Sequence, residues 1–407
     1  MTALAVTDAA DGVPLAENGE SRDVLCTAAQ ASALMRSGLL ADVRPGLGGT
    51  WRLVPGSKVG AVHAAGLTVT VEPKLPIERL LFLLEYAPDR PVWHTSTVGV
   101  TDAPDLLSAM ATVFARAADT ATRTGLLQGY RTFDDSLPVL RGRLRIADQL
   151  SRRFAMPLPA EVRYDDYTAD VPENQVLLAA VLRLLRLPTL PKAARGLLVG
   201  LRHRLADVTA PGRGLALPIW TPSRLNVRYL PALRLAGLLL AGSSFEHRPG
   251  DVQVSGFVLN LATIFEDFVV ATLGSALRSL AGGAITPQAR LHLEEACEVD
   301  IRPDLVWRRD GAPAAVVDAK YKAEKPSGYP QADLYQALAY ATVLKLPEAH
   351  LVYAAGNEEP QRHVVLGSGV LIHAHALDLG GSSHDVLQQV SQLADRLAQG
   401  AAAAVTS

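Results

Sequence analysis

The sequence predicts a multidomain α/β (α+β) protein, and three observations lead to that fold class. The chain has 407 residues, which is enough for two or three domains. Hydrophobic residues make up 49% of it and charged residues 20%, as in globular proteins and unlike disordered, collagen-like or coiled-coil chains. The hydrophobic period also changes along the chain, from a strand-like alternation to a helical spacing and then to a mixture of both. We therefore expect regions of different architecture in succession.

The N-terminal hundred residues divide into two predicted parts. Residues 1–24 hold acids, glycine and small side chains without an apolar period, which predicts a flexible tail. Residues 25–100 predict a β-rich region. In LTVTVE, the apolar residues Leu67, Val69 and Val71 alternate with polar ones, as in a strand with one buried face. The segment IERLLFLLEYA that follows has the spacing of a helix.

Residues 101–250 predict a mainly helical region, in which turns that contain proline separate the helices. The four candidate helices cover residues 103–122, 174–185, 192–205 and 230–241. Eight arginines and no lysine lie between residues 116 and 153, with four aspartates among them. Such a stretch suits phosphate groups, because the planar arginine fork grips two oxygens, but a solvated surface explains it as well.

Residues 255–400 predict a mixed sheet flanked by helices, because helices and strands follow one another in this part. In chain order we expect helix 259–280, strands 298–307 and 314–322, helix 332–344, strands 350–354 and 364–375, and helix 383–397.

The segment IRPDLVWRRDGAPAAVVDAKYK, at residues 301–322, carries charged side chains in a sequence that otherwise forms strands. Side chains two residues apart on a strand point to the same face, so Asp318 and Lys320 share one. An acid and a base at the end of a buried strand cost stability unless they pair or bind an ion. These two residues are therefore candidates for chemistry.

Whether Asp304 joins them depends on the turn between the two strands. A two-residue loop at Asp310 and Gly311 would pair Asp304 with Val317 and put it on the face opposite Asp318. A three-residue loop would pair it with Asp318, with the carboxylates about 5 Å apart. If the acids cooperate, we predict that the loop holds an odd number of residues or that the strand carries a β-bulge.

Two neighbouring carboxylates repel each other, and they share a proton unless a divalent cation neutralises them. Mg²⁺ suits such a pair, because it takes oxygen ligands, keeps several waters and is held by one or two carboxylates plus a substrate phosphate. Lys320 could orient or deprotonate a water, or stabilise the charge of the transition state. Asp304, Asp318 and Lys320 with Mg²⁺ thus predict a site that hydrolyses phosphodiesters.

Three further residues are candidates for supporting roles. Glu266 lies in the apolar helix LATIFEDFVVATLGSAL and could reach the same site, although Glu266 and Asp267 could equally face solvent. Gln336 and Tyr340 are four residues apart and share a helix face. This pair could contact a nucleic-acid backbone or brace Lys320, and ordinary packing is the alternative.

Other features narrow the function classes. The two cysteines supply neither a disulfide framework nor a four-thiolate zinc site, which fits a reducing compartment. The histidines lack a helical metal-ligand spacing, and the polarity expected of an edge strand explains His373 and His375 as well as a metal does.

The sequence contains neither a P-loop nor a G-x-S-x-G nucleophile elbow. No apolar run approaches a membrane span, so we expect a cytoplasmic protein without membrane contact. The net charge of −2 by itself opposes nucleic-acid binding mildly.

The ordered motifs of the C-terminal part resemble those of the PD-(D/E)xK nuclease superfamily. The P-D pair that ends at Asp304 and the D-A-K run from Asp318 to Lys320 match its defining pieces. Gln336 and Tyr340 resemble the Q-x-x-x-Y element of its RecB-like branch.

From about residue 50 to 355, the chain is similar to the McrC family, the nuclease subunits of McrBC-type modification-dependent restriction systems. The segments that carry the likeness are VGAVHAAGLTVTVEPKLPIERLLFLLEYA, RGRL, YDDYTADVPENQVLLAAVLRLL, IFEDFV, RPDLVW, VVDAKYK and LYQALAYA.

The resemblance implies an endonuclease subunit of a restriction and antiviral defence complex. Asp304 and Asp318 would be the metal ligands, Lys320 the catalytic lysine and Glu266 an accessory acid. The chain would cut double-stranded, modified DNA together with a ring-forming AAA+ GTPase of the McrB type. That partner would read the modified base and translocate. The N-terminal part of this chain would dock in the ring and stimulate nucleotide hydrolysis.

Two alternatives stay open from the sequence. The chain could be a non-cleaving adaptor that activates the partner NTPase and binds DNA, or a stand-alone repair nuclease that cuts without a partner. Lys322, just past the D-A-K run, is a further candidate for a phosphate contact.

Overall fold

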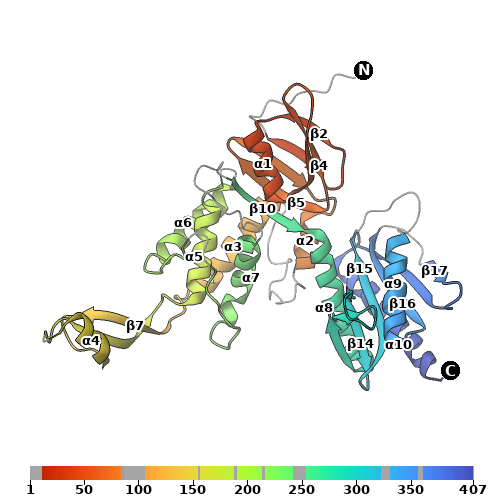
Figure 1. Ribbon diagram of the computed structural model, residues 1–407. Coiled ribbons are helices and arrows are strands. Elements are labelled where there is room, and N and C mark those ends of the chain that lie inside the picture. Colours follow the sequence, from red (N-terminus) through yellow and green to blue (C-terminus); the bar gives the residue numbers. More distant parts are fainter. Residues whose placement is uncertain are drawn as a thin grey trace. The chain divides into compact units, whose positions relative to one another are not determined.

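The computed structural model describes residues 12–84, 86, 106–154, 156–187, 190–212, 216–241, 254–321, 331–355 and 361–406. The chain divides into two compact units (Figure 1). Residues 1–99 and 249–407 form the first unit, and residues 100–248, inserted between them, form the second. Within the described ranges, no helix is both long enough and apolar enough to cross a membrane.

The N-terminal part of the first unit consists of short strands and two helices. In chain order they are β1 (Val13–Ala16), β2 (Arg22–Leu25), α1 (Ala28–Ser37), β3 (Leu40–Pro45), β4 (Thr50–Pro55), β5 (Lys58–Ala64), β6 (Leu67–Glu72) and α2 (Ile77–Leu84). A later strand, β10 (Val254–Asn260), joins them. The strands form two sheets, with orders β1-β6-β5-β10 and β2-β4-β3. The β-rich character expected of this region is confirmed.

Two local features fix the larger of these sheets. The apolar residues of β6 are buried, as their alternation predicts. Gly60 of β5 has a φ of 137°, and a Cβ atom there would lie 1.9 Å from the carbonyl oxygen of Phe257. Only glycine therefore lets β10 pair with β5 at this point.

The flexible tail expected over residues 1–24 is wrong for its second half. Strand β1 pairs in parallel with β6, and β2 pairs with β4. Val13 and Leu15 are buried. These strands have four residues each, which is too short for a hydrophobic period to emerge from the sequence. Residues 1–11 lie outside the described residues.

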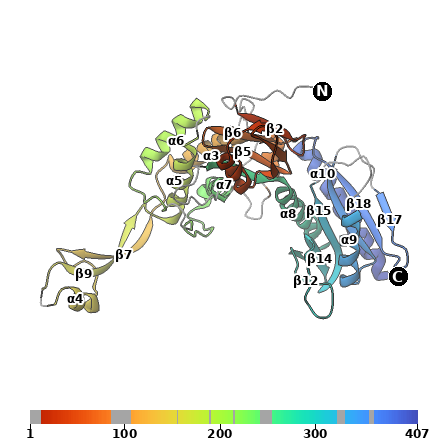
Figure 2. The same ribbon diagram turned by 45° about the horizontal axis from the view of Figure 1, so that its top comes forward.

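The second unit combines packed helices with a projecting arm (Figures 1 and 2). The helices are α3 (Leu106–Thr122), α5 (Pro172–Leu184), α6 (Lys192–Arg204), the short 3₁₀ helix η2 (Val227–Tyr229) and α7 (Leu230–Ala241). The arm is formed by β7 (Gly129–Leu137), β8 (Arg143–Leu144), α4 (Ile146–Arg152) and β9 (Ala160–Thr168). Its three strands have the order β7-β9-β8.

The helices lie close to their predicted positions, but the sequence prediction missed the arm. The reason is the exposure of its strands. Most side chains of β7 are exposed or half-buried, so they show no alternation of apolar and polar residues. The described part of residues 101–250 is mainly helical, as expected, but it also contains this arm.

The C-terminal part of the first unit has a central six-stranded sheet. Its elements are α8 (Leu261–Ala281), β11 (Ala284–Pro287), β12 (Leu291–His292), β13 (Asp300–Ile301), β14 (Leu305–Arg309), β15 (Ala312–Lys320), α9 (Gln331–Leu344), β16 (Glu348–Ala355), β17 (Gln361–Val364), β18 (Leu371–Asp378) and α10 (Ser383–Thr406). The strand order is β11-β14-β15-β16-β18-β17. Strands β15, β16 and β18 run parallel, and β11, β14 and β17 are antiparallel to their neighbours.

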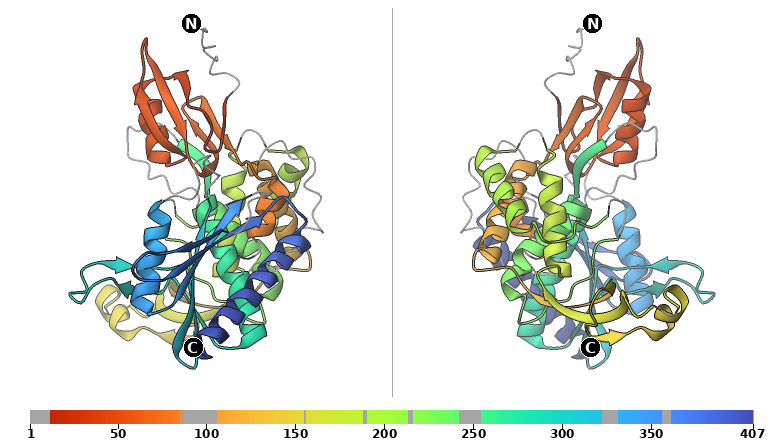
Figure 3. Two further views of the ribbon diagram at one scale, coloured as in Figure 1. Left: turned by 90° about the vertical axis from the view of Figure 1, so that its right-hand side faces the viewer. Right: turned by 90° about the vertical axis from the view of Figure 1, so that its left-hand side faces the viewer.

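Helices cover both faces of this sheet (Figure 3). Helix α9 packs on Val306, Val316 and Leu351 in one core cluster. Helix α8 comes to the other face, where its Gly274 lies against Leu305, the strand neighbour of Val306. The mixed sheet flanked by helices that the sequence predicts is confirmed.

Candidate active site

The residues singled out in the sequence meet at one end of the central sheet. Asp304 directly precedes β14, while Asp318 and Lys320 end β15. Asp304 is 6% exposed and Asp318 2%, so both carboxyl groups are buried. Buried acids of this kind require partners.

The hairpin between the two strands confirms the register that cooperation requires. The turn has two residues, Asp310 and Gly311, and both have a positive φ, as a tight hairpin turn demands. A β-bulge between Trp307 and Arg308 then shifts the pairing by one residue, so that Leu305 pairs with Val317. Asp304 therefore lies opposite Asp318 rather than opposite Val317. Pro313 pairs beside the bulge, where a residue without an N–H group is tolerated.

Two N–H groups hold the Asp304 carboxylate. Its Oδ1 accepts a hydrogen bond from Nε2 of Gln288 at 2.7 Å, and its Oδ2 accepts one from the backbone N–H of Ala319 at 2.8 Å. The second bond ties the acid to the residue between Asp318 and Lys320. Each carboxylate oxygen keeps a further lone pair for a ligand.

The buried Asp318 forms an ion pair with the half-buried Lys320, with Nζ 2.5 Å from Oδ2. Burial and the nearby charge of Asp304 raise the pKa of Asp318 to about 7, although Lys320 opposes this. Burial alone would lower the pKa of Lys320, but its attraction to Asp318 outweighs that effect and raises it. The lysine is therefore held in its charged form.

Helix α8 contributes two acids to the electrostatics of the site. Burial and the charge of Asp304 raise the pKa of Glu266, and the same two causes raise the pKa of Asp267 to about 6. Both side chains are half-buried, so neither is a freely solvated surface residue. The sequence singled out Glu266 alone, and the structure brings Asp267 equally under the influence of Asp304.

Helix α9 supports the segment that leads into Asp304. Gln336 Nε2 donates to the hydroxyl of Tyr340 at 2.7 Å, and that hydroxyl donates to the carbonyl oxygen of Arg302 at 3.0 Å. The two side chains therefore share a face, as their spacing predicts. Tyr340 is buried while Gln336 is exposed, so the tyrosine braces the backbone two residues before Asp304.

A hydrogen bond between Tyr353 and Asp333, which the sequence analysis did not predict, lies beside Lys320. In the parallel pairing of β15 with β16, Lys320 is opposite Tyr353. The hydroxyl of Tyr353 donates to Oδ2 of Asp333 at 3.0 Å, and Asp333 is buried at the start of α9. Its negative charge also helps to raise the pKa of Lys320. The position of Tyr353 beside Lys320 depends on the register between β15 and β16, which the sequence did not reveal. Lys322 lies outside the described residues.

The donor set favours a cation that needs few protein ligands. Within the described ranges, no group of three or more histidine, cysteine, aspartate or glutamate side chains is arranged to hold a metal ion. Asp304 is, however, close enough to Asp318 that its charge helps to raise the pKa of Asp318. Two adjacent carboxylates fit Mg²⁺, which retains waters for its remaining positions, and fit poorly a zinc ion with four protein ligands.

Comparison with known proteins decides the family. A family model for McrBC 5-methylcytosine restriction system components matches residues 53–354. The chain belongs to this family. No curated protein matches the sequence significantly.

A solved structure shares the fold of this chain. The chain is similar to one described as a refined half-complex from the tetradecameric assembly of Thermococcus gammatolerans McrB AAA+ hexamers with bound McrC. That match covers 94% of this chain and all of the other, at 17% identity and a TM-score of 0.62. A Thermococcus gammatolerans McrBC complex solved by cryo-EM also matches, over 65% of this chain and 88% of the other, at 19% identity and a TM-score of 0.43.

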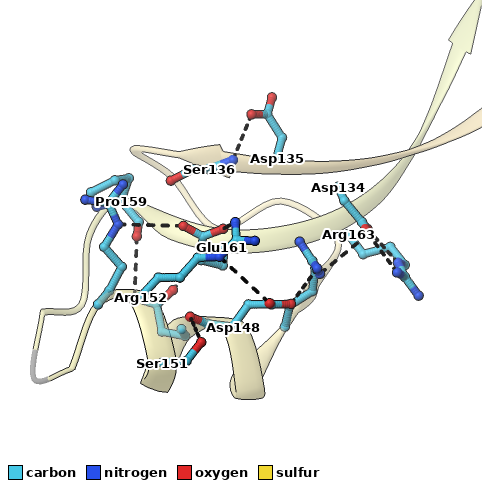
Figure 4. A network of polar contacts seen from close by, with 12 residues as sticks. Asp134, Asp135, Ser136, Asp148, Ser151, Arg152, Pro159, Glu161 and Arg163 are labelled. Atoms are coloured by element: carbon cyan, nitrogen blue, oxygen red, sulfur yellow. Dashed lines mark hydrogen bonds and ion pairs between the residues drawn. The ribbon is translucent and has the colours of Figure 1, made fainter.

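In this McrBC family member, most of the arginine-rich stretch belongs to the arm of the second unit, while Arg116 lies in α3 and Arg123 directly follows it. Arg152 and Arg153 each lie 3.6 Å from the buried carboxylate of Glu161, and Arg163 donates two hydrogen bonds to Asp134 (Figure 4). Further ion pairs in the described part of the stretch join Arg131 to Asp170, Arg141 to Asp166, and both Arg145 and Arg152 to Asp148, and Arg145 also lies near Asp134. These arginines are therefore partnered by acids of the same unit, which accounts for their clustering without a phosphate ligand.

Proposed function

We propose that this chain is the DNA-cleaving subunit of a McrBC-type restriction complex. It would be a Mg²⁺-dependent endonuclease that hydrolyses phosphodiester bonds of double-stranded DNA in the cytoplasm. The observation that carries the proposal is the bulged strand pairing that sets Asp304 opposite Asp318, with Lys320 on the same face. Two buried carboxylates side by side reduce the stability of a fold, so their arrangement points to a catalytic use.

The charge states of the residues suggest their roles. Asp304 and Asp318 would hold the Mg²⁺, which when bound polarises the phosphate and activates water. Without a bound cation, the attraction to Asp318 raises the pKa of Lys320, which favours a role as a cation over a role as a base. As the water oxygen bonds to phosphorus and the bond to the leaving sugar oxygen breaks, Lys320 would offset the developing negative charge.

Neighbouring residues support DNA as the substrate. The exposed cations Arg290 and Arg302 lie on either side of Asp300 in the segment that leads into Asp304, and the ring of His292 contacts the same carboxylate. Arginine side chains of this kind are common contacts of a phosphate backbone. The exposed amide of Gln336 offers a further backbone contact, and Glu266 would serve as an accessory acid.

The partner we propose is a ring-forming AAA+ GTPase of the McrB type, which would recognise modified DNA. Family membership and the fold shared with a structure that contains McrB hexamers support this choice. The expected docking region at residues 25–100 would be joined by the arm, which exposes several large apolar side chains. Its largely exposed apolar side chains include Tyr130, Leu140, Ile146, Phe154 and Met156. Such a surface is typical of a protein contact.

A cleavage assay tests the catalytic assignment. With the partner, GTP, Mg²⁺ and methylated DNA, the wild-type chain should cut, and Lys320→Ala should lose cleavage while it still stimulates GTP hydrolysis. Asp310→Asn is the matched control, because it alters an acid of the same hairpin at a turn position that suits asparagine. Full cleavage by Lys320→Ala would exclude the proposed site. Stimulation of GTP hydrolysis by a wild-type chain that cuts no DNA would favour the adaptor.

A second assay tests the arm. Phe154→Ser should weaken binding to the AAA+ partner and its stimulation, because it removes an exposed apolar contact without disturbing a core. Ile219→Ser, which changes an equally exposed residue of the same unit outside the arm, is the control. Equal loss in both variants would argue against a specific role of the arm.

A further inference from the structure

Gln288, the residue after β11, contacts Asp304 twice. Its backbone N–H donates to the carbonyl oxygen of Asp304 at 3.0 Å, and its side-chain Nε2 donates to Oδ1 at 2.7 Å. No motif of the sequence points to this residue, which stands 16 positions before Asp304 in a loop. The two bonds hold the backbone and the carboxylate of the same residue together.

The backbone of Gln288 is in an unusual conformation. Its φ is 47°, in the left-handed region, where glycine, asparagine and aspartate are common and glutamine is not. Residues held in such conformations require compensation from their surroundings, and they cluster at functional sites. Here the conformation directs both donors of Gln288 toward Asp304, although the residue itself is exposed.

The effect on Asp304 is to fix the orientation of its carboxylate. With Gln288 on Oδ1 and the N–H of Ala319 on Oδ2, rotation of the group would break a hydrogen bond to a charged acceptor. A ligand held in this way does not have to be ordered when a cation binds.

We propose that Gln288 is a positioning residue for the metal ligand Asp304, an inference that rests on the proposed function. It acts through Asp304 and touches neither the cation nor the DNA. A merely structural role for Gln288 would reside in its backbone bond, which joins the end of β11 to the start of β14. The proposed role resides in the side-chain amide, so substitutions that keep the backbone separate the two.

The test uses the full chain with Mn²⁺ as the probe of the cation site. Gln288→Ala removes the amide and keeps the backbone N–H, and Gln288→Met removes the donor while it keeps the length of the side chain. We expect the dissociation constant for Mn²⁺, measured by titration calorimetry, to rise about 10- to 100-fold in both, as is usual when a group that orients a metal ligand is lost. The Mg²⁺ concentration for half-maximal DNA cleavage with the partner should rise in parallel.

Gln361→Ala is the matched control, because it removes an exposed glutamine from β17, at the edge of the sheet opposite β11. It should bind Mn²⁺ like the wild type, and circular dichroism should show that all three variants are folded. If Gln288→Met is folded and binds Mn²⁺ as tightly as the wild type, the inference is overturned while the proposed function stands. If the wild type itself neither binds Mn²⁺ nor cleaves DNA, both are overturned.

Discussion

Replacement of Asp318 by asparagine should stabilise the metal-free protein at neutral pH while it abolishes DNA cleavage. Burial and the charge of Asp304 raise the pKa of Asp318 from 3.8 to about 7. The folded chain thus binds this proton more tightly than the unfolded chain, and its free energy of unfolding falls as the pH rises from about 4 to about 7. At about 1.4 kcal/mol for each pKa unit, the ionised group costs the folded protein up to about 4 kcal/mol at pH 8.

Asparagine resembles the protonated acid, so Asp318→Asn should recover most of this free energy. For a unit of this size, the gain corresponds to an increase in melting temperature of roughly 2–4 °C per kcal/mol. Thermal unfolding with EDTA at pH 8 and pH 5 measures it. At pH 5 the gain should shrink by more than half, because Asp318 is then protonated in the folded wild type.

The matched control is Asp310→Asn, which removes a carboxylate from the exposed turn of the same hairpin. Its melting temperature should stay close to that of the wild type at both pH values. If Asp318→Asn melts below the wild type at pH 8, or its gain is the same at pH 5, the two carboxyl groups do not oppose each other as described.

Three further predictions concern the supports of the site and the fold. Tyr340→Phe leaves the carbonyl oxygen of Arg302 without its hydrogen-bond donor, so it should lower the free energy of unfolding by about 1–2 kcal/mol and slow DNA cleavage. Unchanged cleavage would show that the tyrosine does not support the site. Gly60→Ala should destabilise the first unit by more than about 3 kcal/mol, because its Cβ would collide with Phe257, and wild-type melting would contradict the strand pairing. Burial lowers the pKa of His375 to about 3, so stability is lost as the pH falls below about 6.5. His375→Leu should therefore make the free energy of unfolding fall less steeply as the pH decreases below about 6.5. An unchanged pH dependence would show that His375 does not cause this loss of stability.

The sequence predicted how the central residues of the candidate site are arranged, because strand geometry is strict. Side chains alternate along a strand, so the shared face of Asp318 and Lys320 followed from their spacing. The sequence predicted that Asp304 lies beside Asp318 only if the loop holds an odd number of residues or the strand carries a β-bulge. The structure has the bulge. The pairing of Gln336 with Tyr340 followed from helix periodicity in the same way.

What the sequence missed depends on contacts between distant segments. Gln288 reaches Asp304 from a loop without any periodic pattern, and Asp333 at the start of helix α9 contacts Tyr353 of strand β16. The sequence analysis did not predict the strands of the arm, for a different reason. Its strands bury too little apolar surface to leave an alternating signature, and ion pairs such as that of Arg163 with Asp134 accompany their pairing instead.

The pairing of β5 with β10 has a consequence for the order in which the protein can fold during its synthesis. Strands β5 and β6 end at residues 64 and 72, but their sheet gains its last strand only when residues 254–260 have been made. At about 5–20 residues per second, the ribosome needs about 10 to 40 seconds for the residues between. The inserted second unit is translated completely within that interval and can form its own core first. Until then the edge of β5 remains open to other strands, so a chaperone or the partner subunit that covers it would raise the yield of the folded chain.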